Sequence, residues 1–256
     1  MKTCKMCSRE FEKLVKSHVI PESFFRAIKK ESDHLLVVSS NKDEHTKKSR
    51  IGIYDQEILC LSCEEKFKPL DDYGQKILLQ NQSSFRAIFE EGGAYPVGWV
   101  FEQEVDFVKL KMFFCSVLFR ADISENIFYQ HVVLGPYQTV LKDMIDNNVE
   151  DSNQSFTIFI RKFDIEKNKF AREILLDPRP IRIDGVRFYQ IYFGSGYVVY
   201  IKVDKLQAPS TFQRLLLGMM PRLYMVSGDL DDSAELSIIK KIGESLREKQ
   251  TLQKVK

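Results

Sequence analysis

The sequence lacks several features that would assign it to a large class of proteins. No apolar run is long enough to span a bilayer, and the first residues contain no apolar signal-peptide core. We therefore expect a cytoplasmic protein with no membrane partner. No internal repeat is visible, and the chain contains neither a serine-nucleophile motif nor a dinucleotide fingerprint. These absences leave the cysteines as the main source of functional information.

A strong net charge is also missing. The 38 lysines and arginines nearly balance the 36 aspartates and glutamates, which leaves a net charge of +2. A protein that coats nucleic acid through charge alone is usually more basic, so we expect any contact with DNA to come from a local patch. One patch contains Lys47, Lys48 and Arg50, which we expect to touch the phosphate backbone. The alternative interpretation of this patch is ordinary solvated surface.

The 256 residues are 44% hydrophobic and 29% charged, as in an ordinary globular protein. Apolar patterns predict helices over 105–119 and 137–147. Strands are predicted over 156–163, and over 186–193 and 197–203 on either side of a glycine-containing turn. The pattern predicts an α+β fold in which helices pack on an antiparallel sheet.

The sharp turn at residues 91–96 suggests a division of the chain into two domains. Residues 1–95 would form a zinc-binding module. Residues 96–256 would form an α+β domain that recognises a substrate or a partner. An apolar stripe over 233–250 is expected to be core, or the seam for a protein partner or a homo-oligomer.

The strongest signal is a pair of Cys-x-x-Cys motifs, Cys4 with Cys7 and Cys60 with Cys63. A cytosolic chain does not favour disulfides, and a thioredoxin-like redox site needs one such motif rather than two. Zn²⁺ prefers a tetrahedron of four thiolates, and each motif can supply two of them from a tight turn. We therefore predict one structural zinc ion. The fifth cysteine, Cys115, lies in an apolar run and is expected to be a core residue.

The residues around the cysteines resemble the HNH endonuclease family, whose ββα-metal core is often held by four cysteines. The similarity covers about residues 1–75 and includes Ser17-His18-Val19-Ile20-Pro21 and Leu59-Cys60-Leu61-Ser62-Cys63-Glu64. It implies a treble-clef-like ββα module and a metal-dependent nuclease that hydrolyses DNA, a type of protein found in bacterial defence.

The resemblance assigns roles to individual residues. His18 matches the histidine that activates the attacking water. Asp55 falls where the family has an asparagine, and Glu64 falls where it has a final histidine. These two carboxylates would hold a catalytic Mg²⁺ or Mn²⁺ ion. Ser17 stands where the family has an acidic or histidine ligand, and its hydroxyl is a poorer ligand for a hard cation.

Two other functions remain open at this point. In one, the zinc-held fold has lost catalysis and docks nucleic acid or a protein. In the other, the chain is a structural protein that assembles through its C-terminal helix. The three hypotheses differ in geometry, because only the nuclease requires His18, Asp55 and Glu64 to converge on one point.

Overall fold

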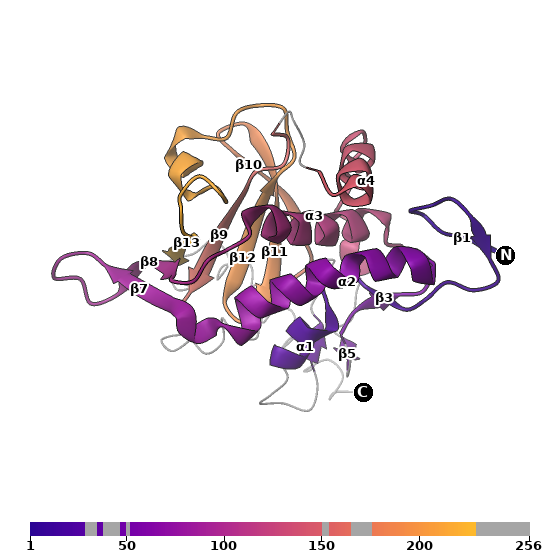
Figure 1. The fold of residues 1–256 in the computed structure, drawn as a ribbon, viewed down its shortest axis with the longest axis horizontal. Coiled ribbons are helices and arrows are strands. Elements are labelled where there is room, and N and C mark those ends of the chain that lie inside the picture. Colours follow the sequence, from indigo (N-terminus) through magenta and orange to yellow (C-terminus); the bar gives the residue numbers. More distant parts are fainter. Residues whose placement is uncertain (29–34, 38–46, 50–51, 150–153, 165–175, 229–256) are drawn as a thin grey trace, which may run out of the picture.

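A computed structural model describes residues 1–28, 35–37, 47–49, 52–149, 154–164 and 176–228. The fold is α+β, as the sequence predicts (Figure 1). The helix expected over 233–250 lies outside the described residues. No helix in the described ranges is both long enough and apolar enough to cross a membrane.

Short strands and two helices form the N-terminal part of the chain. In chain order they are β1 (Lys2–Thr3), β2 (Glu10–Phe11), β3 (Ser17–His18), α1 (Glu22–Ile28), β4 (Leu35–Val37), β5 (Lys47–Ser49), β6 (Tyr54–Asp55) and α2 (Leu61–Gln75). The strands pair as antiparallel ribbons, β1 with β2, β3 with β6 and β4 with β5. The helix α2 runs through Pro69 without a break.

A seven-stranded sheet forms the centre of the molecule. Its strands are β7 (Phe85–Phe89), β8 (Pro96–Phe101), β9 (Ile158–Phe163), β10 (Arg179–Ile183), β11 (Val186–Gly194), β12 (Tyr197–Lys202) and β13 (Tyr224–Gly228). Their spatial order is β10-β11-β12-β9-β13-β8-β7. All neighbours are antiparallel except β13 and β9, which are parallel. The expected antiparallel sheet is therefore present with one parallel pair.

Three consecutive residues with positive φ join β11 to β12. The φ angles of Gly194, Ser195 and Gly196 are 69°, 51° and 82°. Glycine adopts this left-handed region at little cost, so the two glycines explain why the chain reverses here. The hairpin that the sequence predicts around these residues is confirmed.

The helix α3 (Phe107–Ile123) is apolar on nearly all sides because it is surrounded by other elements. It packs against α2 and against α4 (Tyr137–Asn147). Phe113 of α3 contacts Phe24 of α1 and Phe193 of β11, with ring centroids 5.9 and 5.8 Å apart. Gly74 of α2 allows the close approach of α3, since a Cβ there would lie 2.5 Å from the Phe113 ring.

The expected boundary at residue 95 lies within the β7–β8 hairpin. One continuous apolar core includes Cys4 and Phe67 from the N-terminal part, and Phe113 and Val199 from the remainder. Residues on both sides of the boundary therefore share a core. Loss of order near the cysteines would remove support from the larger sheet as well.

Candidate metal centre

The first cysteine pair lies in the turn between β1 and β2. The backbone N–H of Cys4 donates to the Arg9 carbonyl (2.9 Å), and the N–H of Ser8 donates to the Cys4 carbonyl (2.8 Å). Ser8 has a φ of 58°, in the left-handed region. This tight turn directs the sulfur atoms of Cys4 and Cys7 toward the same point.

The second pair lies at the beginning of α2. Cys60 is the N-cap residue, with extended backbone angles, and Cys63 is in the first turn. The N–H groups of Cys63 and Glu64 donate to the Cys60 carbonyl (3.1 and 3.0 Å). The positive end of the helix dipole favours negative charge at this position, and thiolates at helix N-termini are stabilised in the same way.

The two pairs converge on one point. All four sulfur atoms lie within 4.8 Å of one another, and Cys7 Sγ is 3.9 Å from Cys60 Sγ. A zinc–sulfur bond length of about 2.3 Å places tetrahedral thiolates roughly 3.8 Å apart, whereas a disulfide requires about 2.05 Å. All four cysteines are free thiols, and three of them are buried. The donor set and its geometry fit a structural zinc ion.

Hydrogen bonds hold the sulfur atoms in place. The N–H of Cys60 donates to Cys4 Sγ at 3.4 Å, and Ser62 Oγ lies 3.3 Å from Cys60 Sγ. Such contacts around the ligands fix their orientation. The bond from Cys60 to Cys4 also joins the two cysteine pairs, which are far apart in the sequence.

The pKa values of the thiols differ strongly within the cluster. Burial raises the pKa of Cys7, but hydrogen bonds to Arg9 and to neighbouring sulfurs outweigh burial and lower it to about 6. Burial and the nearby cysteines raise the pKa of Cys63 far above its ordinary value. Four adjacent thiols cannot all ionise without a cation between them. A bound Zn²⁺ supplies that charge.

The residues predicted to be catalytic lie on the adjacent ribbon of β3 and β6. Ser17 is directly opposite Asp55, and His18 is directly opposite Tyr54. Successive side chains of a strand point to opposite faces. Ser17 and Asp55 therefore share the buried face, while His18 and Tyr54 share the other face, where His18 is half-buried and Tyr54 is 38% exposed.

The Asp55 carboxylate is fully engaged by groups of the protein. Its Oδ1 accepts from the Glu57 N–H (2.8 Å). Its Oδ2 accepts from the Ser124 hydroxyl and from the Glu125 N–H, both at 2.8 Å. These bonds attach β6 to the C-terminal end of α3. Asp55 thus has a structural role here.

Glu64 interacts with Ser17 and with a buried arginine. Ser17 Oγ donates to Glu64 Oε2 at 2.6 Å. Burial raises the pKa of the Glu64 carboxyl above its ordinary value, and the positive charge of Arg120 and the Ser17 hydrogen bond only partly oppose this. Across the described ranges, the four cysteines form the only group of three or more His, Cys, Asp or Glu side chains placed to share a metal ion. His18, Asp55 and Glu64 are therefore not brought together as a Mg²⁺ or Mn²⁺ site.

Searches for related proteins add no identification. Family models, curated proteins and solved structures give no match to this chain.

Arg120 is a buried residue that the sequence analysis did not single out. Its guanidinium donates to both oxygens of Asp71 (2.9 and 2.6 Å) and to the His18 carbonyl (2.9 Å). Arg120 is 0% exposed and lies over the Phe67 ring, 4.8 Å from its centroid. The signal in the sequence for this buried role was a charged residue, Arg120, directly after an apolar run. This arginine links α2, α3 and the backbone of β3.

The structure describes part of the predicted basic patch. Lys47 and Lys48 lie on β5, opposite Val37 and Leu36 of β4. Arg50 lies outside the described residues. A different basic and aromatic group is present near His18: the Tyr54 ring centroid is 5.9 Å from that of His18 and 4.3 Å from Lys16 Nζ.

Proposed function

We propose that the N-terminal part of the chain is a zinc-held nucleic-acid-binding module of treble-clef-like architecture. The observation that carries this proposal is the β3–β6 register. It directs Ser17 and Asp55 inward, where protein groups satisfy their polar atoms, and leaves His18 and Tyr54 on the opposite face. The order of cysteine turn, ribbon and cysteine-bearing helix supports the treble-clef assignment.

The outer face of the ribbon has the chemistry of a nucleic-acid contact. Tyr54 and His18 present aromatic rings, and Lys16 lies against the Tyr54 ring. Bases stack on aromatic side chains, and each stack contributes about 1–3 kcal/mol. A neighbouring cation contacts the phosphate backbone. Lys47 and Lys48 on the β4–β5 ribbon supply further positive charge within the same module.

A nuclease is the second candidate function. The succession of β3, β6 and α2 has the order that the HNH resemblance implies, and His18 stands at the position of the general base. Against catalysis, both oxygens of Asp55 accept hydrogen bonds from the protein, and Glu64 accepts one from Ser17. Binding without hydrolysis is the simpler use of this arrangement.

The test of binding is fluorescence anisotropy with fluorescein-labelled single-stranded and duplex oligonucleotides at low salt. We expect Tyr54→Ala to weaken binding about tenfold, because a base loses its stacking platform. Lys16→Ala should lower the slope of log affinity against log salt concentration by about 1, the contribution of one phosphate contact. Lys76→Ala is the matched control, since Lys76 is an exposed lysine at the C-terminal end of α2. Absence of binding, or equal binding by wild type and Tyr54→Ala, would overturn the proposal and favour a protein partner.

The test of catalysis uses the same oligonucleotides with Mg²⁺, Mn²⁺ or EDTA. Binding without cleavage supports the module proposed here. Cleavage that requires the metal and disappears in His18→Ala would establish the nuclease instead.

A further inference from the structure

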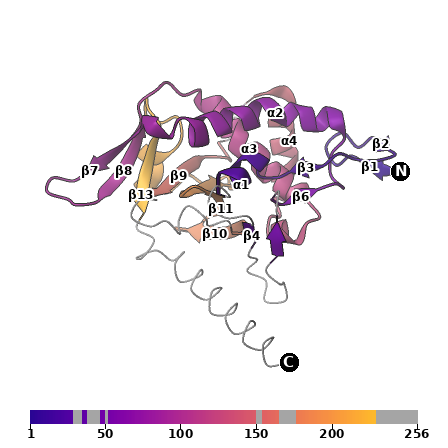
Figure 2. The same cartoon turned by 90° about the horizontal axis from the view of Figure 1, so that it is seen from below.

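A β-hairpin projects from the body of the molecule and carries exposed aromatic side chains. Figures 1 and 2 both show β7 and β8 extending beyond the helices and the remainder of the sheet. Phe89 and Tyr95, at its tip, are 54% and 61% exposed, and β7 is the last strand of the sheet. Exposed apolar groups on an edge hairpin are typical of a contact surface.

The same tip is acidic. Glu90 and Glu91 follow Phe89 directly, and both are exposed. Neither side chain forms an ion pair within the described ranges. We call Phe89, Glu90, Glu91 and Tyr95 the arm tip. It combines two aromatic rings with two exposed carboxylates.

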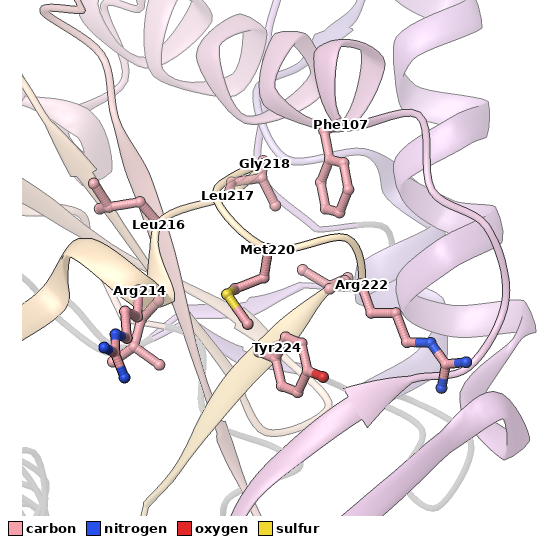
Figure 3. A pocket seen from close by; sticks show the side chains of 10 residues that line it. Phe107, Arg214, Leu216, Leu217, Gly218, Met220, Arg222 and Tyr224 are labelled. Atoms are coloured by element: carbon pink, nitrogen blue, oxygen red, sulfur yellow. The ribbon is translucent and has the colours of Figure 1, made fainter.

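A small cavity on the sheet has the opposite charge. Phe107, Met220 and Tyr224 contribute its apolar lining, and Arg214 and Arg222 lie at its edges. Figure 3 shows the two guanidinium groups on either side of Met220 and Tyr224. Both arginines are exposed, and neither has an ion-pair partner in the described part of the chain. We call these five residues the arginine pocket.

We propose that the arm tip of one molecule docks against the arginine pocket of a second copy of this chain. The pocket is shallow, with room for about one water molecule. A partner surface therefore lies across it and does not insert a side chain. An aromatic ring flanked by two carboxylates matches an apolar cavity flanked by two guanidinium groups, and carboxylates pair well with arginine.

The contact has to form between molecules. Tyr224 of the pocket pairs with Val100 of β8, whereas the tip lies beyond Ile88 and Gly98 at the far end of the same hairpin. The arm cannot reach its own pocket without leaving the sheet. When each of two copies docks its arm tip on the other, the contact forms twice. The resulting two-fold symmetry is the commonest in small oligomers. This inference is independent of the proposed nucleic-acid binding.

Sedimentation velocity of the full chain between about 1 and 100 μM tests the proposal, because we expect a small interface to dissociate within this range. Wild type should associate with rising concentration, and more weakly at high salt. The paired change Glu90→Lys with Glu91→Lys should raise the dissociation constant at least about tenfold, as should Arg214→Glu with Arg222→Glu. Glu104→Lys and Lys205→Glu are controls at exposed positions outside both surfaces, and should associate like wild type.

Mixing the two charge-reversed proteins makes the test specific. The lysine-bearing arm then meets the glutamate-bearing pocket, so association should return in the mixture. A wild type that stays monomeric at the highest concentration would overturn the proposal. Association that survives in both charge-reversed proteins would also overturn it, and would indicate another interface, such as pairing between β7 edges.

Discussion

Ser17 Oγ donates a 2.6 Å hydrogen bond to the Glu64 carboxylate. In the HNH resemblance these are two positions that bind the catalytic cation. Here they bind each other, and the positive charge beside Glu64 comes from the buried Arg120 guanidinium. A protein cation thus takes the electrostatic role that a metal ion would have, which is why the module is expected to bind rather than cut.

The raised pKa of Glu64 predicts a pH dependence of stability. In the unfolded chain this carboxyl loses its proton near 4.5, while burial makes the folded protein retain it to higher pH. The folded state then binds more protons, so the contribution of Glu64 to stability is lost as pH rises through the folded pKa. Glu64→Gln cannot ionise and should be more stable than wild type near neutral pH, with the difference shrinking toward pH 4.

Urea unfolding of both proteins at several pH values measures that difference. Subtracting the free energy of unfolding of wild type from that of Glu64→Gln at each pH removes the pH dependence of the cysteines, which both proteins share. A Glu64→Gln protein that loses stability relative to wild type as pH rises would contradict the assigned direction.

The buried pair of Arg120 and Asp71 predicts a large mutational effect. Arg120→Met should destabilise the protein by about 3–5 kcal/mol, because it leaves the Asp71 carboxylate, whose side chain is only 19% exposed, without its partner. Adding Asp71→Leu should recover much of the loss, since an apolar replacement of both partners is often nearly neutral. Thermal or urea unfolding reports each value.

Lys68→Met is the matched control for that pair. Lys68 and Asp72 form an ion pair on the same helix, but their side chains are 72% and 61% exposed. Such a surface pair contributes about 1 kcal/mol or less. Equal costs for Lys68→Met and Arg120→Met would argue against the structural role given to Arg120.

The cysteines predict a contrast between two substitutions. Cys60→Ser should abolish zinc binding and unfold the N-terminal module, because the free energy of structural zinc, about 10 kcal/mol in zinc-finger peptides, is also folding free energy. The shared core should transmit the loss to the sheet and lower its melting temperature. Metal analysis and hydrogen exchange over residues 1–28 and 52–75 measure both effects.

Cys115→Ala controls for the loss of a cysteine as such. Cys115 is buried in α3, away from the cluster, so this variant should retain one zinc ion and lose only about 1 kcal/mol. A folded Cys60→Ser protein without zinc would refute the structural role of the metal.

Sequence patterns predicted the features that depend on local chemistry. The spacing of the cysteines identified the metal cluster, since each pair is fixed by its own turn. Helical periodicity predicted 137–147, the bounds of α4, and the glycines at 194 and 196 predicted the β11–β12 hairpin. Each of these signals is contained within a short stretch of chain.

Other features depend on contacts between distant residues. The turn at 91–96, which suggested a division of the chain, closes a hairpin whose strands join the large sheet. Asp55 matched a catalytic position of the HNH family in sequence, but its carboxylate accepts hydrogen bonds from Ser124 and Glu125. These residues lie at the C-terminal end of α3, and the sequence alone does not show that this end packs beside Asp55. The role of Arg120 likewise depends on how α2 and α3 pack, which no local pattern encodes.

X-ray absorption at the zinc edge of the purified protein tests the structural zinc site. We expect one zinc ion per chain with four sulfur ligands at about 2.3 Å and no nitrogen or oxygen ligand. A chain without zinc, or a site in which a histidine nitrogen or a carboxylate oxygen replaces one of the sulfurs, would contradict it.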